Sequence, residues 1–323
     1  MIHKTTLQQT RTAPLGMSAA RPQPRRGVRF FMQKYGPPMG LVLPFVVLFV
    51  LFVLWPVLRS LYLSFTDYTG IKAPNLVGAT NYVNMLHDPR FYKALRNSLT
   101  YMFFTSLIST SVGLLLALSF GGQKLAHQLM RAAFFLPLVA GGVGIIGVWK
   151  WIASSEEFGL FNTVRKMFGA ESIRFFGDPH YALPLLIVIG VWSVLGYNMV
   201  IFVAGLRSIA PEIYEAAAID GAGPSARFWK ITLPLLRPTI LYVLVTGMIG
   251  TFQEFFTPYV LFSDTNNVGG ILDSGLTLTV YLYDVGFRHF EMGAASAIAW
   301  LLFTVIFILT LINLRIGRIN DLD

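Results

Sequence analysis

The side chains best suited to bind a ligand are a few polar and aromatic residues inside long apolar runs. Gln253 and Glu254 lie near the middle of one run, and Asn198 lies near the middle of the preceding run with Trp192 and Tyr197. Polar groups are costly to bury in an apolar span, so they mark binding sites by default. Amide and carboxylate groups could hold hydroxyls, and rings could cover C–H faces. Hydrogen bonding between helices is the alternative for the polar residues, and packing is favoured for the aromatic ones.

Lys150 is a further candidate contact, because it ends an apolar run between Trp149 and Trp151. A lysine in this position typically extends its ammonium group to the membrane interface. If Lys150 instead faces a pathway, it favours an acidic ligand. Glu254 argues against an acidic ligand, unless its carboxylate is paired or protonated.

Several kinds of catalytic chemistry are not predicted by this sequence. The chain has no Cys, which removes thiolate metal sites, and its five His residues are scattered without the His–Glu helical spacing of zinc hydrolases. It has no phosphate-binding loop, so we expect no ATP hydrolysis by that route. One Gly-x-Gly-x-x-Gly string, at Gly142, Gly144 and Gly147, lies inside an apolar run. It predicts close helix packing rather than nucleotide binding. We therefore expect no metal, no cofactor and no enzyme.

The elements that carry these residues are predicted to be membrane-spanning helices. Hydrophobic residues make up 54% of the 323-residue chain and charged residues 13%, about half the charged share of a soluble domain. A bilayer core about 30 Å thick needs roughly 20 apolar helical residues. Six runs fit, and period-2 alternation is absent, so we predict an all-α integral membrane protein. The runs are Met39–Leu58, Ser98–Phe120, Ala132–Trp149, Tyr181–Leu206, Thr239–Phe262 and Met292–Leu314.

The orientation follows from the positive charges outside the six runs. Fifteen Lys and Arg residues lie on the side that holds both termini, and nine lie on the other side. This asymmetry predicts that both termini are cytoplasmic, and it accounts for the net charge of +9 without nucleic-acid binding. We predict a disordered basic tail over residues 1–38, a transmembrane domain over 39–314 and a C-terminal tail over 315–323.

The connection over residues 208–238, between the fourth and fifth spans, is longer than a plain connector needs. Pro211 suits the first helical position, and Glu212 and Glu215 suit the first turn. Gly221 then ends the element. We predict a helix of about ten residues outside the membrane, with a small face rich in alanine. A surface helix of this kind is suited to docking a soluble partner.

The spacing within this loop resembles a known family signature. Glu215-Ala216-Ala217 is followed after three residues by Gly221, and after nine more by Ile231-x-Leu233-Pro234. This resembles the membrane permease subunits of binding-protein-dependent ABC importers. The extended form, with Asp220 to Gly223 and Phe228 to Pro234, looks like the carbohydrate-uptake branch, which includes the maltose and glycerol-phosphate importers. The resemblance covers about residues 40–318. It departs from the family pattern after the fifth span, over Phe262 to Gly270.

The resemblance implies a permease subunit in a bacterial inner membrane that imports a carbohydrate by alternating access. ATP and Mg would be bound by two separate ATPase subunits, and a second homologous permease, a solute-binding protein and membrane lipid complete the implied partners. The cargo stays open between a neutral oligosaccharide, an acidic one such as a uronate, and a phosphorylated polyol. Substrate contacts are implied on spans four and five. The residues implied in coupling to the ATPase are Glu212, Glu215, Ala216, Ala217, Asp220, Gly221, Gly223, Leu233 and Pro234.

Two rival functions stay open at this point. An ion-driven secondary transporter would be marked by inverted repeats with broken helices, and we detect no internal repeat. A membrane-embedded enzyme would need a clustered acid–base or metal set. Neither rival explains the long cytoplasmic loop.

Overall fold

The fold was derived from a computed structural model that describes residues 28–155, 159–263 and 267–319. Within these ranges the chain is α-helical apart from short π- and 3₁₀-helical turns and irregular connections, and the only β-type pairing is an isolated bridge between Thr66 and Leu76. The predicted all-helical class is confirmed.

The chain divides into two compact units, Met1–Val57 and Leu58–Asp323. The first unit contains α1 (Val28–Phe49), which continues through a π-helical turn (Val50–Leu54) into α2 (Trp55–Leu63), and the boundary between the units falls within α2. Side chains from Met39 to Leu58 are all exposed, as lipid-facing residues would be. The first predicted run is therefore helical. The helix begins inside the segment predicted as a disordered tail, and residues 1–27 of that tail lie outside the described ranges.

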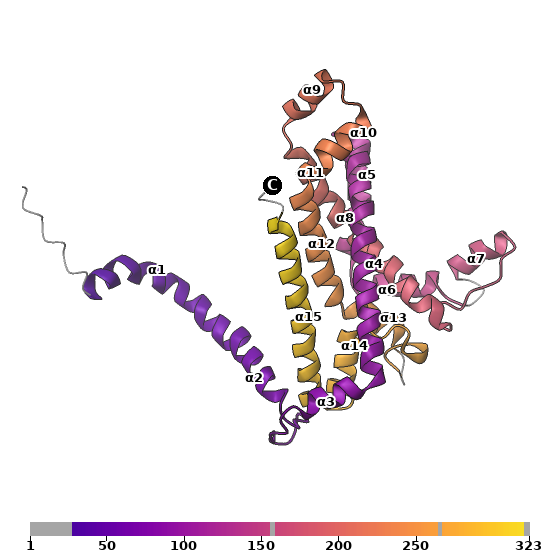
Figure 1. The fold of residues 1–323 in the computed structure, drawn as a ribbon. Helices are drawn as coiled ribbons and strands as arrows, with labels where there is room; N and C mark the ends of the chain where they lie inside the picture. Colours follow the sequence, from indigo (N-terminus) through magenta and orange to yellow (C-terminus); the bar gives the residue numbers. More distant parts are fainter. Residues whose placement is uncertain (1–27, 156–158, 264–266, 320–323) are drawn as a thin grey trace, which may run out of the picture. The chain divides into compact units, whose positions relative to one another are not determined.

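The second unit contains the remaining helices. Figure 1 shows α9 at one end of this unit and α3 and α14 at the other, and the last turn of α15 lies toward the α9 end. The helix α15 also extends beyond the predicted span into the predicted C-terminal tail. The bounds are α3 Thr80–His87, α4 Pro89–Phe120, α5 Leu125–Ala140, α6 Val143–Ile152, α7 Leu160–Met167, α8 Pro179–Arg207, α9 Pro211–Ile219, α10 Pro224–Arg227, α11 Leu233–Leu235, α12 Arg237–Phe252, α13 Phe256–Phe262, α14 Leu278–Tyr283 and α15 Met292–Ile319.

The two longest helices of this unit begin with the same dipeptide. Asp88 precedes Pro89 at the start of α4, and its carboxylate accepts the N–H of Arg90 at 2.8 Å. Asp178 does the same at the start of α8, where it accepts the N–H of His180 at 2.9 Å. An acidic cap followed by proline satisfies free amides and fixes the first helical φ angle. The sequence therefore sets where these spans begin.

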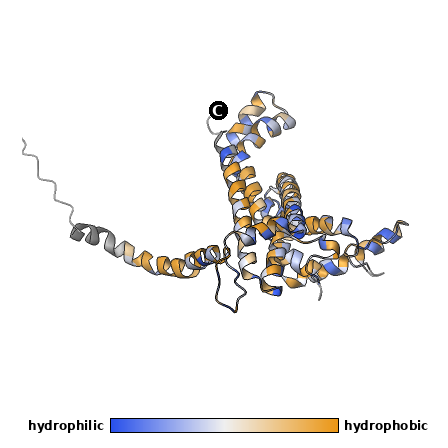
Figure 2. Ribbon diagram, turned by 60° about the horizontal axis from the view of Figure 1, so that its bottom comes forward, coloured by the Kyte–Doolittle hydropathy of each residue, from blue (hydrophilic) through white to orange (hydrophobic). Residues whose placement is uncertain are grey.

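Two predicted spans are broken. The third run was predicted as one helix, but α5 and α6 meet at 108° because Gly141 and Gly142 leave helical geometry, with Gly142 at φ +100°. The fifth run divides into α12 and α13 at Gln253–Phe255. Among the described residues, four helices are long and apolar enough to span a membrane, and there are up to six spans if two bent pairs, α5 with α6 and Pro224–Leu235 with α12, each count as one. In Figure 2 the long helices are mostly hydrophobic.

The core of the second unit forms where α4, α8 and α12 meet. Gly113 of α4 lies against Asn198 of α8, where an added Cβ would come within 2.8 Å of the Asn198 Cβ. Gly196 of α8 lies still closer to α5, since its added Cβ would be 2.1 Å from the Phe134 carbonyl oxygen. Small residues allow this close approach between helix backbones. The bundle around the middle of α8 is therefore tightly fixed.

Candidate functional site

A pocket of about 370 Å³ lies between α4, α8 and α12. Its volume falls within the ~300–1,000 Å³ typical of small-molecule sites. The side chains that α8 and α12 contribute come from the middle of the predicted spans. The pocket is lined by Tyr101, Thr105, Gly190, Ser193, Val194, Tyr197, Asn198, Thr246, Gly247, Gly250, Thr251, Glu254 and Thr257.

The break between α12 and α13 brings Glu254 into this pocket. Its carboxylate Oε1 accepts the backbone N–H of Thr257 at 2.9 Å, and its carbonyl oxygen accepts the Thr279 hydroxyl at 2.7 Å. The interruption is thus held by hydrogen bonds from both sides. Helix breaks near the middle of a membrane are tolerated where the freed backbone lines a cavity.

Several polar groups of the pocket have no partner in the described part of the chain. Asn198 is 4% exposed and its amide makes no hydrogen bond there. The buried Thr105 hydroxyl is also unpaired, and so is the hydroxyl of the buried Tyr101. Of these three groups only the Thr105 hydroxyl is itself fully buried, and leaving such a group unpaired costs roughly 1–3 kcal/mol. A ligand rich in hydroxyls would satisfy both the donors and the acceptors.

The pocket holds three of the six residues predicted to contact a ligand, namely Tyr197, Asn198 and Glu254. Gln253 is exposed outside the lining. Trp192 packs edge-on against Trp149, with ring centroids 5.4 Å apart, as the packing alternative requires. Lys150 is half-buried on α6 and does not line the pocket.

Sequence reasoning missed the contribution of α4. Tyr101 and Thr105 lie one helical turn apart and face the pocket, and Ser109 continues the same buried face one turn further on. Hydroxyls repeated every four residues along an apolar span form one polar stripe. This spacing was the signal that would have added α4 to the predicted site.

The close helix packing predicted for the glycines of the third span is not observed in the described part of the chain. An added Cβ at Gly142, Gly144 or Gly147 meets no atom within 4 Å. Among the described residues these glycines therefore do not mediate close packing. Gly142 instead has the positive φ angle of the 108° bend, which glycine adopts with little strain.

The helix predicted between spans four and five is present as α9, with Pro211 in its first turn. Gly221 follows it at φ +76° and ends the helix, as predicted. Most of its side chains are exposed. The exposed positions include the predicted residues Glu212, Glu215, Ala216, Asp220, Gly221 and Gly223, whereas Ala217 is half-buried.

One polar contact attaches this helix to the segment that follows it, and a second one closes the turn between them. The Tyr214 hydroxyl of α9 lies 3.0 Å from the Thr232 hydroxyl, and the Arg227 Nε donates to the Ala222 carbonyl at 2.7 Å. Thr232 is buried immediately before α11, which contains the predicted Leu233 and Pro234. After α11, the chain bends by 62° into α12. A displacement of α9 would thus be transmitted to the helix that lines the pocket.

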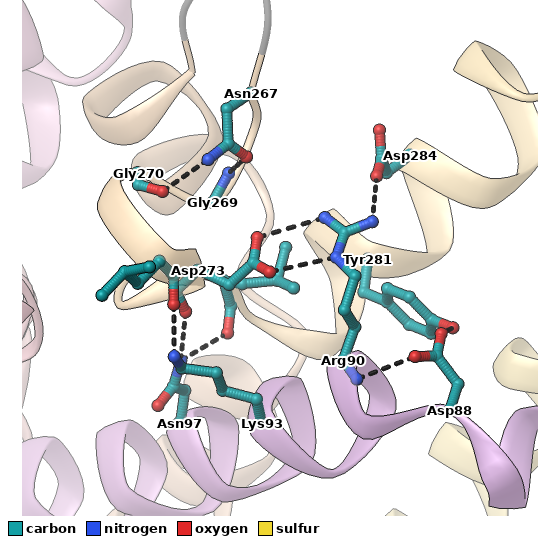
Figure 3. A network of polar contacts seen from close by, with 12 residues as sticks. Asp88, Arg90, Lys93, Asn97, Asn267, Gly269, Gly270, Asp273, Tyr281 and Asp284 are labelled. Carbon is teal, nitrogen blue, oxygen red and sulfur yellow. Dashed lines mark hydrogen bonds and ion pairs between the residues drawn. The ribbon is translucent and has the colours of Figure 1, made fainter.

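A second polar site, at the opposite end of the unit, was not predicted. Figure 3 shows Arg90 of α4 paired with Asp273, at 3.0 and 3.1 Å, and with Asp284 at 3.0 Å. Asn97 donates to the carbonyls of Asp273 and Leu276, each at 3.0 Å. These contacts fix the turn around Asp273, which has a positive φ angle of 54°.

Tyr281 adds an anchor to the same polar site. Its hydroxyl donates to the Asp88 carboxylate that caps α4. Burial, and then this hydrogen bond, raises the pKa of Tyr281 above its ordinary value. The site thus joins α14 to the start of α4.

Comparisons with known proteins identify a family and similar permeases. The family described as "binding-protein-dependent transport system inner membrane component" matches residues 109–321. The arabinooligosaccharides transport system permease protein AraP of Bacillus subtilis is 35% identical over 289 residues, which cover 89% of this chain and 90% of the relative. The sn-glycerol-3-phosphate transport system permease protein UgpA of Brucella abortus is 30% identical over 280 residues, which cover 86% and 93%.

A solved structure shares the fold. The crystal structure of a bacterial alginate ABC transporter, in complex with a pentasaccharide-bound periplasmic protein, superposes with a TM-score of 0.78 at 22% identity. The match covers 91% of this chain and 98% of that one. On the family match and the two permease relatives, the chain belongs to the inner membrane components of binding-protein-dependent transport systems.

Proposed function

We propose that the chain is the permease subunit of an ATP-driven importer that moves a carbohydrate across the bacterial inner membrane. The single observation that carries this proposal is an exposed helix, α9, joined through α11 and α12 to a pocket that contains several polar side chains. The membership of the chain in a family of permeases supports it. In this proposal the α9 end is cytoplasmic, and so are both termini.

The pocket would receive the carbohydrate from a solute-binding protein. The unpaired groups of Tyr101, Thr105 and Asn198 can each exchange hydrogen bonds with sugar hydroxyls. The ring of Tyr197 can cover a C–H face. Alternating access would then expose the pocket first to one side of the membrane and then to the other.

The coupling of transport to ATP would run through α9. Two ATPase subunits with ATP and Mg would bind at this end, one of them against α9, and a second homologous permease would complete the pair. The alanines of α9 allow close approach, and Ile219 is 87% exposed at its end. A large apolar side chain that is exposed at the end of a surface helix can fill a pocket on a partner.

Reconstitution of the whole transporter into proteoliposomes tests this proposal. ATP inside and sugar-loaded binding protein outside should give sugar uptake and stimulated ATP hydrolysis. Omission of either ATP or binding protein should abolish uptake. Uptake that needs neither component would refute the proposal.

One observation favours the rival ion-driven transporter: two predicted spans are broken, and broken helices are typical of secondary transporters. It would require uptake that collapses with an ionophore and continues without ATP. The proposed importer should show the opposite response. Among the described residues, no group of His, Asp or Glu could hold a metal ion, so a membrane-embedded metalloenzyme receives no support there.

A further inference from the structure

The charged side chains that line the pocket between α4, α8 and α12 are of one sign only. Its lining includes one ionisable acid, Glu254, and none of the Lys, Arg or His residues of the described chain. The relatives named above transport an arabinooligosaccharide and a glycerol phosphate, so they do not choose between an uncharged and an anionic cargo. The chemistry of the pocket does choose.

Glu254 is fixed with its carboxylate toward the pocket. One carboxylate oxygen accepts the Thr257 N–H at 2.9 Å, a contact to which a negative charge contributes favourably. A helix terminus therefore stabilises the carboxylate without adding a positive side chain. The second oxygen has no hydrogen-bond partner in the described part of the chain and can accept a bond from a ligand hydroxyl.

The nearest basic candidates do not offset this charge. Lys150 lies on α6 and is absent from the lining. Arg90, at the outer end of α4, is already paired with Asp273 and Asp284 at 3.0 Å each. Arg96 is exposed one and a half turns before Tyr101, about 7.5 Å along the helix axis at 1.5 Å per residue.

We infer that the carbohydrate which passes this pocket is uncharged, and that Glu254 excludes sugars that carry a carboxylate, sulfonate or phosphate. This inference rests on the proposed function and names its substrate class. At an effective dielectric constant of about 20, two like charges about 6 Å apart weaken binding by about a hundredfold. A neutral sugar avoids that repulsion and donates a hydroxyl to the carboxylate.

The charge of the pocket can be measured without any transport assay, because the chain has no Cys. A single Val194→Cys substitution places one thiol in the lining. Methanethiosulfonate reagents that carry an ammonium or a sulfonate group then report the local potential through the ratio of their reaction rates. We expect the ammonium reagent to react at least about tenfold faster. Equal rates, or a faster sulfonate reagent, would overturn the inference.

Two variants assign this ratio to one carboxylate. Glu254→Gln keeps the size and the acceptor oxygen, and it should bring the two rates within about threefold. Gln253→Glu is the matched control, since it adds a carboxylate one residue away but outside the pocket lining. That control should change the ratio much less than Glu254→Gln does, because the exposed side chain lies farther from the thiol and is screened by solvent. A ratio that survives Glu254→Gln would show that another group sets the potential.

Uptake into proteoliposomes then tests the cargo itself. The probes are a neutral trisaccharide and the uronate of the same sugar and linkage, each offered with the binding protein. Wild-type transporter should favour the neutral sugar at least about tenfold, and Glu254→Gln should narrow this preference. Preferred uptake of the uronate would refute the inference. Uptake of neither sugar, with the thiol ratio as expected, would instead count against the proposed function.

Discussion

The exposed side chain of Ile219 offers the most direct test of how the chain would dock an ATPase. Ile219 ends α9 and is 87% exposed. Full burial of an isoleucine side chain is worth about 1.5–3 kcal/mol, so docking of Ile219 would contribute about 2 kcal/mol. An aspartate at this position loses that term and must also be desolvated, which costs at least about 1 kcal/mol more.

Ile219→Asp should therefore weaken ATPase binding by about 3 kcal/mol, or roughly two-hundredfold. The fold of the chain should not change, because the side chain has almost no contacts to lose. Ile71 supplies a matched control, since it is 88% exposed in the connection between α2 and α3. Ile71→Asp should leave ATPase binding within about twofold, because surface substitutions away from an interface have small effects.

The measurement is the amount of ATPase that stays on immobilised transporter after dilution, in detergent and in nanodiscs. Membrane insertion and thermal stability of both variants are recorded beside it. Wild-type retention by Ile219→Asp would refute the docking argument. Equal losses in Ile219→Asp and Ile71→Asp would refute it as well, because a general surface effect would then explain both.

Three further outcomes follow from particular contacts. Gly221→Asp should leave membrane insertion intact, because an added Cβ meets no atom within 4 Å. It should abolish ATPase association, because φ is +76° and a residue other than glycine strains the turn that ends α9. Co-purification of the ATPase measures this, and association at the wild-type level would refute the assigned role. Arg90→Met should lower the free energy of unfolding by about 2 kcal/mol, because it removes the nearer guanidinium from Asp284, which is 3% exposed and keeps Arg288 at 3.5 Å. Exposed Arg96→Met should be neutral, and the unfolding temperature distinguishes the two variants. Gly196→Val should prevent stable folding, as its Cβ would lie 2.1 Å from a carbonyl oxygen, and monodisperse wild-type yield would contradict this.

The helical spans could be predicted because each one repeats a strong local signal. Four of the six predicted runs are unbroken helices. The Asp-Pro starts of α4 and α8 and the Pro211 start of α9 are also local, since a cap and a proline act within one turn. Helix α9 was predicted from Pro211, the acidic residues of its first turn, its alanines and the glycine that ends it, which are all local signals.

The breaks could not be predicted from the apolar pattern. Hydropathy counts the residues of the third run as one span, but it carries no information on direction, and the 108° bend at Gly141–Gly142 leaves that count unchanged. The break at Gln253–Phe255 depends on Thr279, which lies 25 residues beyond Glu254 and holds the Glu254 carbonyl oxygen. Contacts of this range are not encoded in a periodicity.

Three of the six residues predicted to contact a ligand line the pocket, namely Tyr197, Asn198 and Glu254. Asn198 and Glu254 could be found in spans four and five because such polar residues are rare there. The hydroxyls of α4 were overlooked because serine and threonine are common in spans, where they often bond the preceding turn. Thr105 differs, since its hydroxyl is buried without a partner.

Helix α12 connects the α9 region to the pocket, so a movement of α9 could reach a bound ligand through it. Thr232, which meets Tyr214 of α9, is buried beside α11, so a push on α9 is not absorbed by a loose loop. The next rigid element, α12, carries the lining residues Thr246 and Thr251 and ends at the break that holds Glu254. A small rotation of α12 would then change the pocket and the position of the carboxylate together. The break interrupts the helical hydrogen-bond pattern and is held by the Thr257 and Thr279 contacts together with local turn bonds, so it is where such a rotation would be taken up.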